Sequence, residues 1–353
     1  MRQSPIRRYI LNNLSQHHKD IVKAAVRKFG LSRQAVLRHM KVLILDGKVE
    51  AHGRTRDRYY VLKPIVNELF EFDISSSFDE DVIGRRHIYP HLKDCPLNIR
   101  KICEYGFSQI MNNVIVHSKG KTCKVRFLIN EESINLKIRD DGSDGLLSRI
   151  ASIYNLDDPF CGALELTKGK VSTDFKRHTG EGIFFVSRLF DSVIIRSNGY
   201  SLKHNLEKNN WKLNNSEKDI KGTSISLHIK KTSDQTFEDT MAKFSSKPDG
   251  SRFDKTFIPV NLVRVGSETL MSRGQARRLL RRLNEFKEVV FDFANVHTIG
   301  QPFADEVFRV FPSDHKETKL SIINSTIEID TIIKRVKNNS QSNAKDNGIL
   351  YDE

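Results

Sequence analysis

The sequence predicts a multidomain α/β protein. The chain has 353 residues, enough for two or three domains that each bury a core of their own. Residues 1–63 contain 15 Lys and Arg but only four Asp and Glu, and so carry +11 of the formal charge of +14. Further along, helical and strand-like hydrophobic patterns alternate. We therefore expect one end of the molecule to meet a polyanion and the rest to form α/β domains.

The composition excludes several classes of protein. No apolar run approaches the length of a membrane span, and the first residues, MRQSPIRRYI, lack the apolar core of a signal peptide. The cysteines have no spacing typical of a metal site or a redox motif. We expect reduced thiols in a cytoplasmic protein, and these are Cys95, Cys103, Cys123 and Cys161.

The basic N-terminal segment is predicted to contain two amphipathic helices and a hairpin. Phe29-Gly30-Leu31 separates the helices, and Ser32 is placed to cap the second one. Short strand patterns follow at 48–53 and 58–62. The side chains left to point outward are Arg33, Gln34, Arg38 and Lys41 on the second helix and Arg54, Arg56 and Arg58 at the tip of the hairpin.

This order of elements resembles the winged helix-turn-helix domain of bacterial transcription regulators. The resemblance implies that the second helix enters the major groove of double-stranded DNA and that the wing reaches the flanking backbone or minor groove. Arg and Gln side chains can read base edges, and the wing arginines can neutralise phosphates. A winged-helix domain used for protein contacts is the alternative.

The segment from Phe107 to Ser118, FSQIMNNVIVHS, has the pattern of a buried helix with one polar stripe. Gln109, Asn113 and His117 are four residues apart, so they lie on the same helix face. Because buried amides need hydrogen-bond partners, this stripe faces either solvent or a ligand.

Three further pieces follow along the chain. A hairpin over residues 123–138 alternates hydrophobic and polar residues and leads into Asp140-Asp141-Gly142, which is a carboxylate at a strand end beside a glycine that admits a ligand. Gly180 and Gly182 precede an amphipathic helix whose N-terminal amides can hold a phosphate. Gly222-Thr223 begins another alternating strand.

In this order, the pieces resemble the GHKL ATP-binding fold shared by gyrase, the heat-shock 90 chaperones, MutL and sensor histidine kinases, and most closely the small anti-sigma-factor kinases. The resemblance implies an α/β sandwich with helices over one face of a mixed sheet, and ATP held under a mobile lid at about residues 146–179. It also implies the matched roles: Asn113 coordinates Mg²⁺ at the phosphates, Asp140 accepts the adenine amino group, Gly142 lets the base approach, Gly180 and Gly182 cradle the phosphates, and Thr223 places its hydroxyl near the adenine.

Two departures from the family pattern affect catalysis. Gln109 stands four residues before Asn113, where the family has a carboxylate general base. A neutral amide accepts no proton, so a contribution of ~10²–10⁴-fold is lost unless another group substitutes. Asp144 replaces the second glycine of the Asp-x-Gly-x-Gly box, and Gly145 follows it. We therefore expect that the protein binds ATP, and the sequence supports ATP hydrolysis less well.

The predicted lid carries several cations. Each of them either meets the γ-phosphate or is an ordinary solvated loop charge. They are Lys168, Lys170, Lys176 and Arg177.

The C-terminal third alternates between helices and strands again. A helix ends near Phe286, a buried strand spans Val289–Phe293, a helix begins near Gln301, and the strand KLSIIN and the helix EIDTIIKRV follow. This order resembles the STAS-like domain found beside GHKL modules in bacteria. In partner-switching STAS proteins a serine accepts phosphate where Gln301 stands here, and Thr298, the nearest hydroxyl, is expected to be structural.

The basic run in the first helix of this domain is expected to be a solvated face rather than a second nucleic-acid site. It consists of Arg277, Arg278, Arg281 and Arg282. The predicted organisation is a winged helix domain (1–63), a linker (64–84), a GHKL domain (85–232), a linker that can include a short helix (233–252), a STAS-like domain (253–338) and a disordered tail (339–353).

We therefore expect a cytoplasmic bacterial transcription regulator in which occupancy of the GHKL module by ATP and Mg²⁺ controls a DNA-binding head, while the STAS-like domain contacts a partner protein. An anti-sigma-type serine/threonine protein kinase, or an ATPase acting on a partner protein, is the alternative, and Gln109 and Gln301 weigh against it. A defence or stress sensor built from the same parts is not distinguished from a regulator, and a homodimer stays open.

Overall fold

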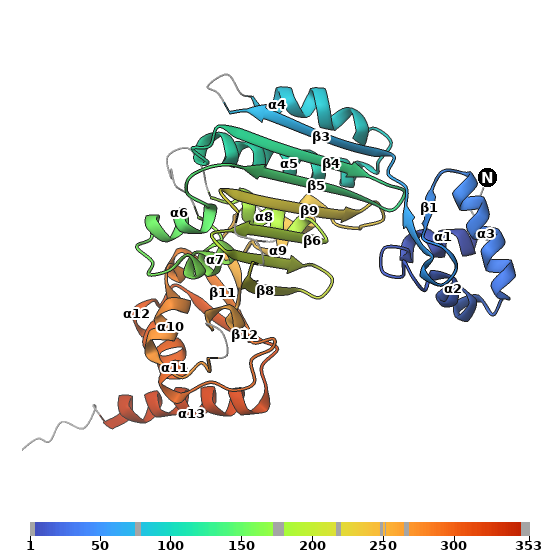
Figure 1. The fold of residues 1–353 in the computed structure, drawn as a ribbon. Helices are drawn as coiled ribbons and strands as arrows, with labels where there is room; N and C mark the ends of the chain where they lie inside the picture. The colour runs from blue at the N-terminus through green and yellow to red at the C-terminus, as the bar shows by residue number, and fades with distance from the viewer. Residues whose placement is uncertain are drawn as a thin grey trace, which may run out of the picture.

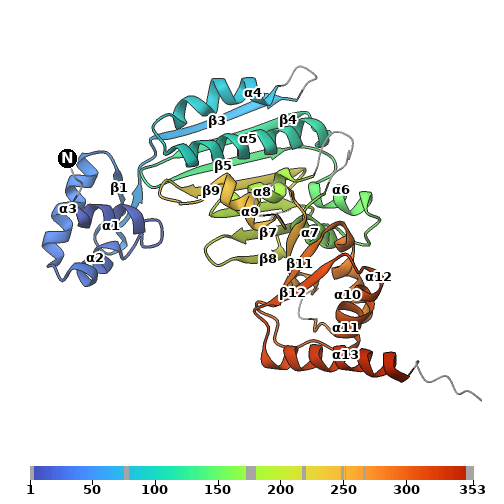
Figure 2. The same cartoon turned by 180° about the vertical axis from the view of Figure 1, so that it is seen from behind.

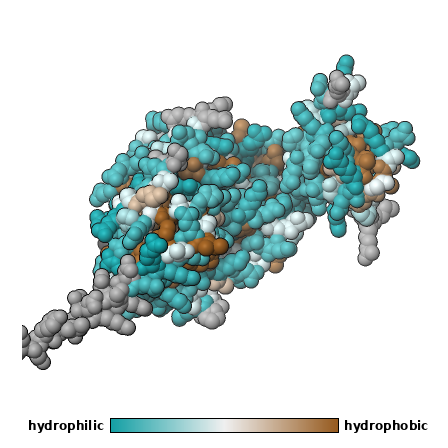
Figure 3. Space-filling view, turned by 90° about the horizontal axis from the view of Figure 1, so that it is seen from below, coloured by the Kyte–Doolittle hydropathy of each residue, from teal (hydrophilic) through white to brown (hydrophobic). Residues whose placement is uncertain are grey.

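The computed structural model describes residues 4–74, 79–171, 180–216, 220–247, 250, 252–264 and 268–346. Over this range the chain is a multidomain mixed α/β protein with three consecutive parts. The N-terminal part stands at one end of a large sheet, and the C-terminal part packs at the β8 edge of that sheet (Figure 1). Hydrophilic residues cover most of the face seen in Figure 3. No helix in the described part of the chain is long and apolar enough to cross a membrane.

The N-terminal part, which we call the head (residues 4–62), has a core of its own centred on Ile10, Val36 and Leu43. The first predicted helix ends at Gly30, which adopts a left-handed conformation with φ +64°, and the Ser32 hydroxyl accepts a hydrogen bond from the Ala35 N–H at 3.2 Å. The predicted helices and hairpin are confirmed, and a further helix precedes them. The elements are α1 (Pro5–Asn13), α2 (Ile21–Phe29), α3 (Arg33–Leu45), β1 (Val49–His52) and β2 (Tyr59–Leu62).

Seven strands form the central sheet in the order β3-β4-β5-β9-β6-β7-β8. Every neighbouring pair is antiparallel, so the expectation of a mixed sheet is wrong. The predicted hairpin of β4 and β5 buries one face, with Val125, Phe127 and Leu136 in the core. The strands are β3 (Val66–Asp73), β4 (Thr122–Ile129), β5 (Ser133–Asp140), β6 (Ser192–Ser197), β7 (Tyr200–Asn205), β8 (Asn210–Asn215) and β9 (Thr223–Lys230).

The edge strand β3 occupies most of the first half of the predicted linker over 64–84. Phe70 pairs with Val125 of β4, and Val66, Phe70 and Phe72 pack against the core. These alternating apolar residues extend the sheet, so a linker is wrong for 66–73.

Helices cover one face of the sheet and leave the other open (Figures 1 and 2). The long helix α5 confirms the predicted buried helix, with Phe107, Ile110, Met111 and Val114 in the core. The helices of this part are α4 (Glu80–Ile83), α5 (Leu97–His117), α6 (Leu146–Ile153), α7 (Pro159–Lys168), α8 (Gly182–Leu189) and α9 (Phe237–Lys243).

The described part of the segment predicted as an irregular lid, residues 146–171, is largely helical. Leu147 and Ile150 of α6 and Ala163 and Leu164 of α7 are buried, so the two helices pack through apolar faces. Residues 172–179, which include Lys176 and Arg177, lie outside the described residues.

The C-terminal part contains a three-stranded parallel sheet in the order β10-β11-β12. The predicted strands and helices are present, together with the unpredicted β10. The last helix continues to Asp346, into the segment that was expected to be disordered. The elements are β10 (Lys255–Pro259), α10 (Arg273–Leu280), β11 (Glu288–Asp292), α11 (Gln301–Asp305), α12 (Phe311–Asp314), β12 (Lys319–Ile323) and α13 (Ile327–Asp346).

The two junctions between the parts differ in kind. The central and C-terminal parts share one continuous hydrophobic core, whereas the head keeps its own. The head contacts the β4–β5 turn through polar groups: the Ser15 hydroxyl donates to Glu132 at 2.9 Å, and Lys48 pairs with Glu131 at 3.2 Å. The head joint is therefore the weaker one.

Candidate functional site

Asp140 is the last residue of β5, and its side chain is 4% exposed. Its Oδ1 accepts hydrogen bonds from the backbone N–H groups of Gly142 (3.0 Å) and Thr223 (3.2 Å). Among the described residues, no donor contacts Oδ2. Burial raises the pKa of this carboxyl group, and the two N–H groups oppose that shift. One oxygen is thus held by two backbone N–H groups, and the other has no donor among the described residues.

The backbone closes tightly around this carboxylate. A Cβ atom on Gly142 would lie 2.0 Å from the Ser118 carbonyl oxygen, and one on Gly222, whose φ is +78°, would lie 2.4 Å from the Asp140 carbonyl oxygen. Both glycines are therefore required by the packing of the chain itself. For Gly142, which the sequence predicts to admit a ligand, the neighbour that excludes a side chain is the end of α5.

Thr223 joins the same centre to α6. Its hydroxyl oxygen accepts a hydrogen bond from the Leu146 N–H at 2.8 Å, at the start of that helix. The N-terminus of α6 is therefore fixed by a residue of β9. Thr223 therefore contacts Asp140 through its N–H and α6 through its hydroxyl, and its place near an adenine stays a prediction.

The polar stripe of α5 extends along the helix from the end near Asp140 toward the start of α8. Gln109 lies against the start of α8, since a Cβ on Gly182 would be 2.3 Å from the Gln109 Oε1. The Asn113 side-chain N–H donates to the Gln109 carbonyl at 2.6 Å, and this bond leaves the Asn113 Oδ1 for another partner. From Gln109 to Ser118 the helix rises by about 13 Å, so α5 connects the turn at Gly182 with Asp140.

Gly180 has φ +69°, and its carbonyl accepts a hydrogen bond from the Val171 N–H at 3.2 Å. A Cβ at this position would lie 2.5 Å from the Val171 backbone. The glycine at position 180 therefore lets its backbone lie directly against the backbone of Val171.

Arg149 of α6 belongs to the site and was not predicted. Its charge acts on Asp140 and Asp144, and burial lowers its pKa. The guanidinium Nε and Nη1 are buried and have no hydrogen-bond partner among the described residues. Buried N–H donors without a partner are costly. These two donors could therefore bind acceptor atoms of a ligand near Asp140. An arginine in the apolar run LLSRIAS is the only local sign of it.

The two described lid lysines face the C-terminal part. Lys168 is fully buried; its Nζ donates to Glu165 (2.7 Å) and to the carbonyl oxygens of Arg278 (3.2 Å) and Arg281 (2.9 Å). Lys170 donates to the Glu285 carbonyl at 2.7 Å. Both predicted roles, a phosphate contact and a solvated charge, are therefore wrong for Lys168, because the helix packs it into an interface.

Two residues of the predicted solvated basic run also belong to this interface. Arg281 donates to the Tyr154 carbonyl at 2.9 Å, and Arg282 donates to the Lys170 carbonyl at 2.6 Å. Arg282 also lies 3.4 Å from Glu165. For these two arginines a solvated face is wrong, and α10 instead ties the C-terminal part to α6 and α7.

The head presents its predicted DNA-facing residues to solvent. The exposed side chains are Arg33, Gln34, Arg38 and Lys41 on α3 and Arg54 and Arg58 at the hairpin tip; of Arg56 only the backbone is described. In the C-terminal part, Gln301 is exposed at the first turn of α11, and Thr298 is half-buried.

The open face of the sheet carries a second cluster of positive charge. Arg139 of β5 and Arg196 of β6 both pair with Ser224 of β9, so they flank it. Lys137 lies two residues from Arg139, and burial together with the charges of Arg196, Arg139 and Arg126 lowers its pKa. Among described residues, Lys137, Arg139 and Arg196 form no ion pair with a carboxylate. We call these three the sheet-face cluster.

Comparisons with known proteins identify the C-terminal part alone. Residues 275–330 match the family described as a STAS-like domain of unknown function (DUF4325), within the range predicted from the sequence. The search of curated proteins returned no match to the chain. In the described part of the chain, no group of three or more His, Cys, Asp and Glu side chains is placed to hold a metal ion.

Proposed function

We propose that this chain is an ATP-binding, DNA-binding transcription regulator. In this proposal the head is a winged helix that binds double-stranded DNA, the central part is a GHKL module that binds ATP with Mg²⁺, and the STAS-like domain contacts a partner protein. The observation that carries the proposal is the carboxylate of Asp140, buried with one oxygen held by two N–H groups and the other without a described donor.

The residues around Asp140 suit a purine nucleotide. The Asp140 Oδ2 would accept the adenine amino group, and the unpaired Nε and Nη1 of Arg149 would donate to acceptor atoms of the ligand. Along α5, Asn113 would offer its Oδ1 to the metal, and the turn at Gly182 would offer backbone N–H groups to the phosphates. When bound, Mg²⁺ would neutralise phosphate charge.

The contacts of the central part supply routes from the nucleotide to both flanking parts. The β5 strand begins beside the head contact at Glu131 and Glu132 and ends at Asp140. On the other side, Thr223 holds α6, and α7 is tied to α10 through Lys168 and Glu165. Ligand-dependent movement of α6 and α7 would therefore change how the STAS-like domain docks.

Nucleic acid would have two basic surfaces to contact. The exposed cations of α3 and the hairpin tip suit base edges and phosphates, and the sheet-face cluster suits a flanking phosphate backbone. The middle of the chain is nearly neutral in total, but the three cations of the sheet-face cluster lie together on the uncovered side of the sheet.

ATP affinity of the full chain tests the nucleotide site. Asp140→Asn keeps an oxygen for the N–H groups of Gly142 and Thr223, but it presents an amide N–H₂ where the adenine amino group needs an acceptor. Losing this charge-assisted bond is worth ~1.5–3 kcal/mol, so affinity should fall about ten- to hundredfold in calorimetric titrations. Asp234→Asn, which removes the same charge from an exposed position of the central part, is the control. Equal ATP affinity of the two folded variants would refute the site.

DNA binding is tested by the salt dependence of affinity for a duplex. Reversing Arg38 and Arg54 to Glu should weaken binding and lower the log–log salt slope by about one unit for each DNA phosphate that the variant no longer neutralises. Lys101→Glu, an exposed change of the same charge on α5, should have a smaller effect. If the unmodified chain bound no duplex at low salt, the head would be a protein-contact module.

A serine/threonine kinase or ATPase acting on a partner protein is the second candidate. The same site would support it if a carboxylate elsewhere in the chain served as general base in place of the neutral Gln109. Phosphate release or phosphotransfer by the purified chain that does not respond to substitution of Gln109 would favour this candidate over the regulator.

A further inference from the structure

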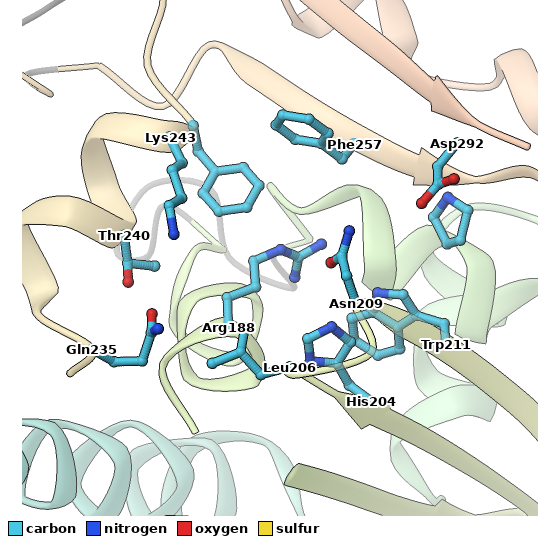
Figure 4. Close-up of a pocket in the computed structure, with 12 residues that line it drawn as sticks. Arg188, His204, Leu206, Asn209, Trp211, Gln235, Thr240, Lys243, Phe257 and Asp292 are labelled. Atoms are coloured by element: carbon cyan, nitrogen blue, oxygen red, sulfur yellow. The ribbon is translucent and has the colours of Figure 1, made fainter. Parts of the chain in front are cut away.

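A pocket lies away from Asp140, where the central and C-terminal parts meet. It has a volume of about 340 Å³ and is bounded by α8, β7, β8, α9, β10 and β11 (Figure 4). This volume is at the lower end of the range for pockets that take small organic molecules. Its walls come from both parts, so an occupant would touch both.

The floor of the pocket holds a buried cation with no carboxylate partner. Arg188 is 7% exposed, and its guanidinium donates to the Phe184 carbonyl (3.0 Å), the Ser187 hydroxyl (2.8 Å) and the Thr167 carbonyl (2.8 Å). All three acceptors are neutral, and in the described residues Arg188 forms no ion pair. A buried charge that is not neutralised is costly, and an anion placed beside it would be stabilised.

A second cation extends toward the same space. Figure 4 shows the side chain of Lys243 pointing from α9 toward Arg188, and the Asn209 amide lying next to the guanidinium. The one carboxylate among the lining residues, Asp292, lies at the other end of the pocket from Lys243. Its Oδ1 is held by the Ala294 N–H (2.9 Å) and the Asn324 amide (2.8 Å).

Aromatic rings form the remaining walls. The rings of Trp211 and His204 have centroids 4.4 Å apart and are tilted by 32°, and Phe257 lines the opposite side in Figure 4. His204 adds no positive charge at neutral pH, because burial and the neighbouring Arg188 lower its pKa to about 3. The pocket therefore has Lys243 at one end and Asp292 at the other, with Arg188 and the flat aromatic surfaces between them (Figure 4).

We propose that this pocket binds a small aromatic monocarboxylate, with its carboxylate at Arg188 and Lys243 and its ring against Trp211. The Asp292 carboxylate disfavours a second negative group at the far end. A ligand here would stiffen the joint between the sheet and the STAS-like domain, so it would act as an effector at a site separate from the Asp140 centre.

Trp211 provides a direct readout, since it is the single tryptophan of the chain. Titrating the full chain with benzoate should change Trp211 fluorescence and raise the melting temperature, with a Kd of about 1 mM for so small a ligand. Benzamide has the same shape without the charge, and terephthalate carries a second carboxylate across the ring. Both should bind about tenfold or more weakly.

Lys243→Met removes an exposed cation without opening the core, and it should weaken benzoate binding about tenfold while leaving the melting temperature of the unliganded protein unchanged. The proposal is overturned if benzoate changes neither fluorescence nor melting temperature at ten times the expected Kd. It is also overturned if benzamide binds as tightly as benzoate, or if Lys243→Met binds benzoate as the unmodified protein does. Tighter binding of terephthalate would overturn the role given to Asp292.

Discussion

Replacing Glu165 by Gln should loosen the joint between α7 and the C-terminal domain. Glu165 and Lys168 are 2% and 0% exposed, and their charged atoms are 2.7 Å apart. The substitution leaves the Lys168 ammonium buried with neutral acceptors only and removes the carboxylate that lies 3.4 Å from Arg282. Removing one partner of a buried ion pair costs about 3–5 kcal/mol. We expect a loss of this size in the free energy of unfolding.

Urea unfolding followed by circular dichroism measures the effect on the full chain. Asp81→Asn, at an exposed pair with Arg85 where the side chains are 56% and 64% exposed, is the control and should change stability by less than about 1 kcal/mol. Replacing both buried partners, with Glu165→Leu and Lys168→Met, should recover most of the loss because the Lys168 charge is removed together with its partner, while Arg282 keeps Glu285 at 2.9 Å. The reasoning is refuted if Glu165→Gln is as stable as Asp81→Asn.

Four further outcomes are expected. Gln109→Glu should raise ATP hydrolysis in a phosphate-release assay with little change in affinity, because a general base acts in the transition state; no gain in rate would show that position 109 lies outside the reaction. Asn113→Ala should lower ATP affinity in the presence of Mg²⁺ more than in EDTA, and equal losses in titrations would exclude a metal contact. Stability should fall as pH decreases from about 6.5 to about 3, by up to roughly 4–5 kcal/mol, because the unfolded chain binds a proton that the folded His204, with its pKa of about 3, does not; His204→Asn should flatten this part of a denaturation series. Reversing Lys137 and Arg196 to Glu should weaken duplex binding and lower its salt slope, and an unchanged slope would remove the open sheet face from the interface.

Local patterns account for what the sequence predicts correctly. The cap at Ser32, the helix break at Gly30 and the alternation along β4 and β5 depend on residues within a few positions of one another, so they are readable without a fold. The strand β3 was missed because its pairing with β4 joins residues 49 to 63 positions apart. The helices α6 and α7 were missed because their stabilisation comes from packing against each other and against the core.

The sequence by itself determined the residue types at the candidate sites, the elements that carry them and the concentration of charge in the head. Tertiary structure alone decided which of these residues meet. Insertion of β9 between β5 and β6 brings Arg139 and Arg196 to the two sides of Ser224, and docking of α10 on α7 turns Lys168 from a loop charge into a buried contact. The physical reason is that the free energy of a charge depends on its burial and neighbours, and in this chain those neighbours come from distant segments.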